Sequence, residues 1–134
     1  MMPDAVAKPL VLLVEDERGI RRVMEMLFED EGYDVLTAKN GSEALELLAN
    51  VTPSMIITDY MMPEMDGAQL LRAIRDDPGL SAIPVLLMSS AHPADLPSDH
   101  LADEVFLKGG ELDSLLAIVG SLIEGNAPSS TSLA

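Results

Sequence analysis

The sequence contains no cysteine, and only 8 of its 134 residues are lysine or arginine. Without cysteine the chain cannot form disulfides, thiol nucleophiles or thiolate metal sites. The few basic residues stand against 23 Asp and Glu, which gives a formal net charge of −15. Because such a surface repels a phosphate-rich polymer over most of its area, we expect no direct binding to nucleic acid.

Long hydrophobic runs are also missing. The first apolar run, residues 10–14, is far too short to cross a membrane and does not resemble the core of a signal peptide, so we expect a cytoplasmic protein without membrane contact. Hydrophobic residues still make up 48% of the chain, as in globular proteins. We predict one domain over residues 10–124, with a flexible N-terminus (1–9) and a flexible C-terminal tail (125–134).

Short apolar runs alternate with longer stretches of helical spacing. The runs, which we interpret as strands, lie at residues 10–14, 34–38, 55–58, 85–88 and 105–107. Helical spacing begins after a cap near Asn40, and again at Asp66 and Gln69, which have the spacing of a capping box. Pro93 and Pro97 interrupt the segment before the last strand, so any helix there is short or irregular. The alternation predicts an α/β fold with a doubly wound parallel sheet.

Polar side chains follow four of these strands at the point where each strand ends. They are Glu15 and Asp16, Asp59, Ser89, and Lys108. Since the carboxyl ends of parallel strands meet at one edge of a sheet, we expect three carboxylates to converge there. Their mutual repulsion requires protonation or a cation, and hard oxygen ligands favour Mg²⁺. A metal-supported carboxylate suits phosphoryl transfer through an acyl phosphate, with an ammonium group and a hydroxyl neutralising the phosphoryl oxygens.

One stretch of sequence connects this pattern to a known family. Asp59 ends an apolar run and is followed, at fixed spacing, by Met62-Pro63-Glu64-Met65-Asp66-Gly67. Together with the acidic pair after the first strand and the later Ser and Lys, this stretch resembles the receiver domains of bacterial response regulators. The resemblance runs from about Leu10 to Glu124. We therefore predict a five-stranded sheet in the flavodoxin-like order 2-1-3-4-5, with a shortened or irregular fourth helix.

The resemblance implies a role for each site residue. Asp59 is the phosphoacceptor and Asp16 a direct ligand of Mg²⁺, whereas Glu15 binds the metal through a water and Met61 through its backbone carbonyl. By the same resemblance, Ser89 hydrogen-bonds the phosphoryl group and Lys108 supplies the cation.

The resemblance also implies partners. The phosphoryl donor is a sensor histidine kinase or a histidine phosphotransfer protein, and the phosphorylated state signals to an unknown downstream protein. Such a domain catalyses only its own phosphorylation and dephosphorylation, so we do not expect an enzyme in the ordinary sense. No output domain follows in the sequence, which suggests a stand-alone regulator or one domain of a longer protein.

Two positions depart from the family pattern on its output side. Gly109 follows Lys108 where a proline is usual, and Val105 stands where a tyrosine or phenylalanine is common. Phe106 is adjacent, but successive side chains of a strand face opposite ways, so it cannot replace that ring. A basic group on the first helix, composed of Arg18, Arg21 and Arg22, is most simply a solvated face, although family members often dock their kinase on this helix.

Other functions fit the sequence less well. A Mg²⁺-dependent phosphohydrolase acting through Asp59 commonly has a second Asp two residues later, and this position is Met61. A nucleotide-binding domain is weaker still, because residues 15–19 contain no glycine-rich phosphate loop. A degenerate receiver that acts only as an interaction module is disfavoured because every site position is filled.

Overall fold

The computed structural model describes residues 8–62, 65–90 and 101–125 of the chain. Within these ranges strands and helices alternate, as the hydrophobic pattern predicts. In chain order the elements are β1 (Leu10–Val14), α1 (Arg18–Asp30), β2 (Asp34–Ala38), α2 (Gly41–Leu48), β3 (Met55–Asp59), α3 (Gly67–Asp76), β4 (Val85–Ser89), β5 (Glu104–Leu107) and α4 (Leu112–Gly125). None of these helices is long and apolar enough to span a bilayer.

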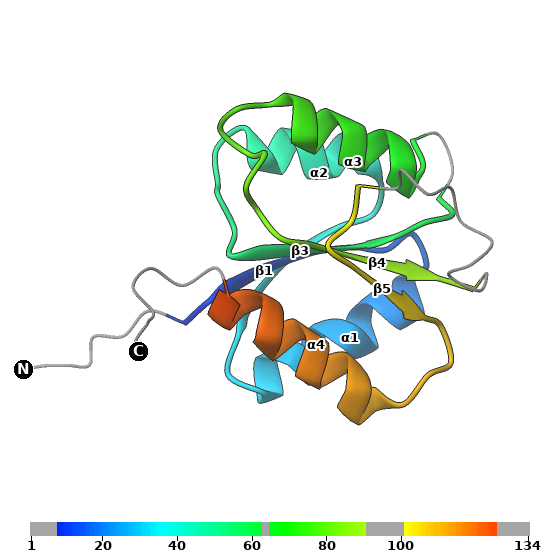
Figure 1. The fold of residues 1–134 in the computed structure, drawn as a ribbon. Coiled ribbons are helices and arrows are strands. Elements are labelled where there is room, and N and C mark those ends of the chain that lie inside the picture. Colours follow the sequence, from blue (N-terminus) through cyan, green and yellow to red (C-terminus); the bar gives the residue numbers. More distant parts are fainter. Residues whose placement is uncertain (1–7, 63–64, 91–100, 126–134) are drawn as a thin grey trace, which may run out of the picture.

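The five strands form one parallel sheet in the order β2-β1-β3-β4-β5, which confirms the predicted order. Figure 1 shows α2 and α3 over one face of the sheet and α1 and α4 over the other. The chain first moves outward from β1 to β2 and then returns past β1 to β3, so the strand order reverses beside β1. In an open sheet of this kind, the functional crevice lies at that reversal, at the carboxyl ends of β1 and β3.

The central strands are buried on both faces, which explains their continuous apolar runs. Alternate side chains supply two separate hydrophobic cores. Leu12 and Ile56 pack toward α2 and α3, whereas Leu13 and Ile57 pack toward α1 and α4, where Phe28 is fully buried. Burial on both sides fixes the register of the sheet, since a slip of one residue would exchange the two sets of side chains.

Side-chain caps begin two of the helices at the predicted positions. The Asn40 side chain accepts a hydrogen bond from the Glu43 N–H at 2.7 Å and caps α2. Asp66 and Gln69 form both hydrogen bonds of a capping box at 2.9 Å, which fixes the start of α3. By contrast, α1 begins after Glu17 without a side-chain cap.

The two residues at the middle of β5 face opposite sides of the sheet. Val105 packs against the core beneath α2 and α3, and Phe106 packs against the core beneath α1 and α4. The ring of Phe106 therefore does not reach the face on which Val105 lies, as the alternation of strand side chains predicts.

Some expectations concern residues that the structure does not describe. Pro93, Pro97 and the rest of 91–100 lie outside the described residues, so the short or irregular fourth helix stays a prediction. The chain is described again from Leu101, which has a positive φ of 69° and precedes β5 without a helix. Of the expected flexible ends, 1–9 and 125–134, residues 1–7 and 126–134 also lie outside the described residues, whereas Gly125 is the last residue of α4.

Candidate functional site

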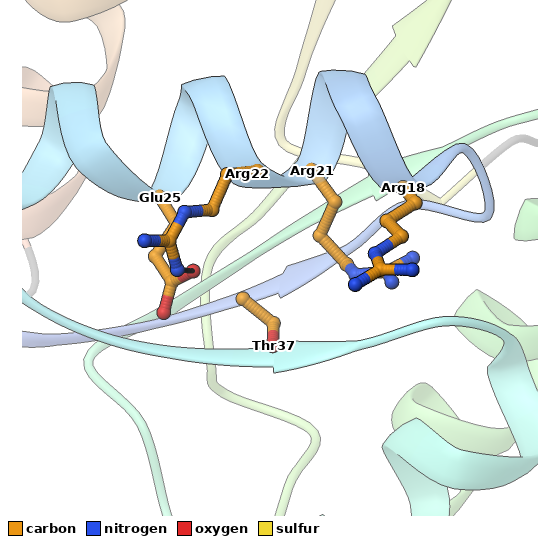
Figure 2. Close-up of a pocket in the computed structure, with 5 residues that line it drawn as sticks. All are labelled: Arg18, Arg21, Arg22, Glu25 and Thr37. Atoms are coloured by element: carbon orange, nitrogen blue, oxygen red, sulfur yellow. Dashed lines mark ion pairs between the residues drawn. The ribbon is translucent and has the colours of Figure 1, made fainter.

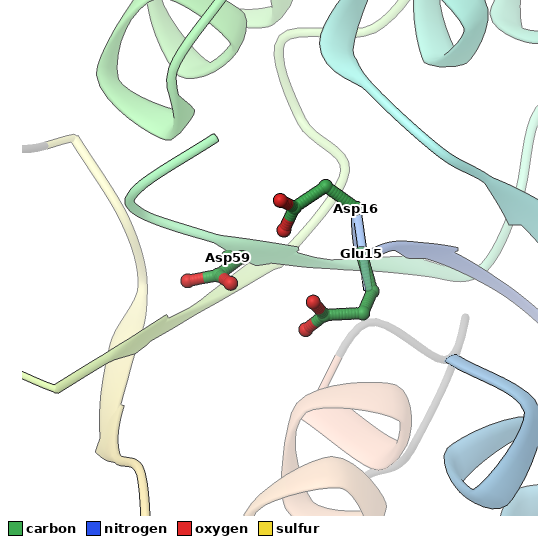
Figure 3. Close-up of side chains that lie close together, drawn as sticks. All are labelled: Glu15, Asp16 and Asp59. Atoms are coloured by element: carbon green, nitrogen blue, oxygen red, sulfur yellow. The ribbon is translucent and has the colours of Figure 1, made fainter. Parts of the chain in front are cut away.

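Three carboxylates come together where β1 and β3 end. Glu15 and Asp16 follow β1 directly, and Asp59 is the last residue of β3. Because the two strands pair in parallel, with Val14 opposite Thr58, their ends lie side by side. One carboxylate oxygen from each residue lies within 4.8 Å of the others (Figure 3). The structure therefore brings together the acidic residues that the sequence places at separate strand ends.

Glu15 is the most deeply buried member of this cluster, with 1% of its surface exposed. Its Oε2 accepts a hydrogen bond from the Glu17 N–H at 3.0 Å, but its Oε1 has no hydrogen-bond partner among the described residues. Burial raises the pKa of the Glu15 carboxyl above its ordinary value, and the nearby charge of Asp59 adds to this effect. The Glu17 N–H and Lys108 oppose the rise only in part.

The cluster fits a hard divalent cation. Asp59 is also buried, with 4% exposed, whereas Asp16 lies on the solvent side. Carboxylates this close repel one another unless a positive charge separates them, and the buried Oε1 of Glu15 is an acceptor that a cation or its water would satisfy. An all-oxygen set open to solvent on one side suits Mg²⁺, which keeps several of its waters.

Lys108 is the positive group of the site. Its Nζ donates a hydrogen bond to Asp59 Oδ2 at 2.5 Å and lies 3.9 Å from Glu15 Oε1. Burial lowers the pKa of the Lys108 ammonium, but the hydrogen bond to Asp59 and the charges of Asp59, Glu15 and Asp16 outweigh burial, so the pKa is raised. Lys108 is therefore charged at neutral pH and neutralises part of the cluster.

The backbone around Lys108 holds this side chain over the cluster. Its N–H donates to the carbonyl oxygen of Ser89 at 2.7 Å, which ties the end of β5 to the end of β4. Gly109 then turns the chain with a positive φ of 89°, a conformation that glycine adopts without strain. A glycine in the left-handed region thus makes the turn at the position where the family that the sequence resembles usually has a proline.

Ser89 and Met61 are the two remaining predicted site residues. Ser89 is 1% exposed and ends β4, one residue beyond the Met88 that pairs with Asp59. Met61 lies two residues after Asp59 and is an exposed residue. Both residues are therefore at the edge of the sheet where the carboxylates converge.

Gly67 allows the start of α3 to lie close against the end of β3. A Cβ on Gly67 would lie 2.6 Å from the carbonyl oxygen of Asp59 and 2.9 Å from the Cα of Tyr60. The Gly67 N–H also donates to the Tyr60 carbonyl at 2.8 Å. Any larger residue at this position would force the backbone to shift.

Arg21 is a site contact that the sequence did not predict. Its guanidinium donates to the carbonyl oxygen of Glu15 at 2.8 Å and so holds the backbone from which the first two carboxylates project. A helical side chain points back toward the helix N-terminus. The position of Arg21 in the first turn of α1 therefore indicated that it could reach the residues just before the helix.

The sequence of the chain is similar to known receiver domains. A family model described as the response regulator receiver domain matches residues 11–119. The response regulator Rre1 of Synechocystis is 32% identical over 133 residues, which cover 93% of this chain and 56% of Rre1. The chain thus spans about half the length of this curated relative.

Solved structures of receiver domains also superpose on the chain. The receiver domain of a signal transduction histidine kinase from Syntrophus aciditrophicus is 30% identical, with a TM-score of 0.84, over 94% of this chain and 98% of that one. The response regulator TrrA of Thermotoga maritima, solved in complex with Mg²⁺-BeF, is 30% identical with a TM-score of 0.77, over 85% of this chain and 98% of TrrA.

Proposed function

The chain belongs to the response regulator receiver domain family, and we propose that Asp59 is the residue on which it carries a phosphoryl group. The observation that carries this proposal is that Asp59 belongs to the carboxylate cluster and also accepts a hydrogen bond from the ammonium of Lys108. Of the three clustered carboxylates, Asp59 is the one hydrogen-bonded to that ammonium.

The proposed metal ligands are the side chains of Glu15, Asp16 and Asp59 and the backbone carbonyl of Met61. The unpartnered Oε1 of Glu15 and the closeness of the three carboxylates support a divalent cation at this position. Mg²⁺ is the proposed cofactor, and TrrA, a relative of the same fold, was solved with Mg²⁺-BeF. When bound, the metal neutralises negative charge on the phosphoryl oxygens.

The remaining residues have positioning and electrostatic roles in this proposal. An oxygen of Asp59 attacks the phosphorus of a phosphohistidine, the phosphorus–nitrogen bond breaks, and the electron pair leaves with the imidazole. Lys108 first holds the Asp59 carboxylate by its hydrogen bond and then neutralises the phosphoryl oxygens. Ser89, at the end of the neighbouring strand, donates its hydroxyl to the phosphoryl group.

We propose a sensor histidine kinase or a histidine phosphotransfer protein as the donor, and a downstream protein that binds the phosphorylated state. The domain itself supplies the groups for its own phosphorylation and for hydrolysis of the acyl phosphate. No separate substrate is part of this proposal.

Intact-mass spectrometry with a small phosphodonor tests the assignment. Acetyl phosphate and Mg²⁺ should add one phosphoryl group to the wild-type chain, and Asp59→Asn or EDTA should abolish the addition. Asp76→Asn, an exposed carboxylate at the end of α3, is the matched control and should be phosphorylated like the wild type. A phosphoryl adduct that persists in Asp59→Asn, or that forms equally well in EDTA, would contradict the proposal.

A further inference from the structure

The helix α1 gathers three of the chain's 8 basic residues within five positions, at Arg18, Arg21 and Arg22. With Glu25 and Thr37 they line a hollow of about 380 Å³ between α1 and the edge strand β2. Figure 2 shows the arginine side chains extending from α1 toward β2, where Thr37 lies. On a chain with a net charge of −15, this hollow is a local concentration of positive charge.

The charges in the hollow are only weakly neutralised. Arg22 forms an ion pair with Glu25 at 3.9 Å. Because 73% of the arginine side chain is exposed, water screens this pair and the attraction between the two charges is weak. Arg21 is bonded to the backbone carbonyl of Glu15 and to no carboxylate among the described residues, and Arg18 has no ion pair within the same ranges. Two guanidinium groups therefore face one hollow without a counter-ion from the described part of the chain.

The chemistry of these groups selects the ligand. Guanidinium groups bind phosphate and carboxylate oxygens through paired N–H donors. A carboxylate offers two oxygens in one plane, whereas a phosphate group offers at least three oxygens in a tetrahedral arrangement, so two arginines and the hydroxyl of Thr37 can bind it from different directions. The volume of the hollow lies in the range of about 300–1,000 Å³ that small-molecule sites occupy.

We propose that this hollow binds a small phosphate-bearing anion, such as a phosphate ester, through Arg18, Arg21 and Thr37. The site is separate from the phosphoacceptor cluster because its donors come from α1 and β2 and none of the three clustered carboxylates lines it. Arg21 connects the two sites, since its guanidinium also holds the Glu15 carbonyl.

Pyrophosphate is a suitable probe. We would titrate it into the isotope-labelled full chain at constant ionic strength, in EDTA, so that no metal can recruit the anion to the Asp59 cluster. Saturable NMR shifts are expected at the amides of Arg18, Arg21 and Thr37, with a Kd below about 1 mM. Arg18→Gln, which removes an exposed side chain without a described partner, should weaken binding by roughly fivefold or more.

Arg72→Gln is the matched control because it removes the same charge from an exposed position on α3. It should leave the affinity for pyrophosphate unchanged. Shifts that do not saturate, or an equal loss of affinity in Arg18→Gln and Arg72→Gln, would overturn the proposal. Either result would mean that pyrophosphate is attracted by the overall charge and binds no specific site. A glutamate-rich peptide that binds the hollow more tightly than pyrophosphate would also overturn it, in favour of an acidic protein surface.

Discussion

Replacing Glu15 by glutamine should stabilise the metal-free protein at neutral pH. The buried Glu15 carboxylate keeps one hydrogen bond, from the Glu17 N–H at 3.0 Å, and the glutamine carbonyl can accept the same bond. The substitution removes a buried charge beside Asp59 and replaces the unpartnered Oε1 by an amide that can donate to that carboxylate. The cost is the attraction to Lys108 across 3.9 Å.

The expected gain is modest. An unsatisfied buried acceptor costs about 1–3 kcal/mol, and loss of the Lys108 attraction offsets part of its relief, so we expect a net gain of about 1 kcal/mol. For a domain of this size that corresponds to a rise in Tm of roughly 3–5 °C in EDTA. Adding Mg²⁺ should stabilise the wild type more than the variant, because a ligand that binds the folded state more tightly stabilises it more, and so should narrow or reverse the difference in Tm.

The pH dependence of the stability difference distinguishes removal of the buried Glu15 charge from a change in packing. Since folding raises the pKa of Glu15 above its ordinary value of 4.5, the stability that its protonated form provides is present below that value and is lost as pH rises through the folded pKa. The advantage of Glu15→Gln should therefore be small in acid and grow toward neutral pH.

Thermal melts across this pH range in EDTA measure the effect. Glu46→Gln, which removes an exposed charge on α2, is the control and should shift the Tm little. A Tm for Glu15→Gln below that of the wild type at neutral pH, or a difference that does not change with pH, would refute the reasoning. The Glu15 carboxylate would then stabilise the metal-free fold.

Three other perturbations test separate parts of the site and the sheet. Asp16→Ala should abolish Mg²⁺ binding in calorimetry without lowering the metal-free Tm, because α1 begins after Glu17 and no side chain, that of Asp16 included, caps it; a lower Tm would contradict this. Gly67→Ala should lower the free energy of unfolding in urea by about 2 kcal/mol, because its Cβ would lie 2.6 Å from the Asp59 carbonyl oxygen; an unchanged urea midpoint would show that the loop relaxes. Beryllofluoride should not produce a stable dimer through β5 in light scattering, because Val105 supplies no aromatic ring there; a dimer protected from amide exchange along β5 would count against this argument.

Periodicity and strand-end chemistry predicted the doubly wound parallel sheet and the carboxylate cluster, whereas the strand order followed from the family resemblance. Apolar runs on both faces identify buried parallel strands, and alternation with helical spacing fixes the layer order. The convergence of Glu15, Asp16 and Asp59 then follows from sheet geometry, because each residue is at the carboxyl end of its strand. Local rules of this kind also predicted the caps at Asn40 and Asp66.

Contacts between a side chain and a distant backbone could not be predicted in this way. Arg75 on α3 donates to the carbonyl oxygens of Ser81, Ile83 and Leu101 and to the carboxylate of Asp103. The sequence gives no periodic signal for such bonds, because they depend on where the loops before β4 and β5 pass the end of α3.

The Arg75 contacts bear on how Lys108 is held. Asp103, bonded to Arg75 at 2.7 Å, also accepts the Val85 N–H at 2.8 Å and donates its own N–H to the Val85 carbonyl at 2.9 Å. These bonds fix the start of β5 against β4, and the bond from the Lys108 N–H to Ser89 fixes its end. The strand that presents Lys108 is therefore anchored at both ends by hydrogen bonds, so the ammonium group is well placed although a glycine, and no proline, follows Lys108.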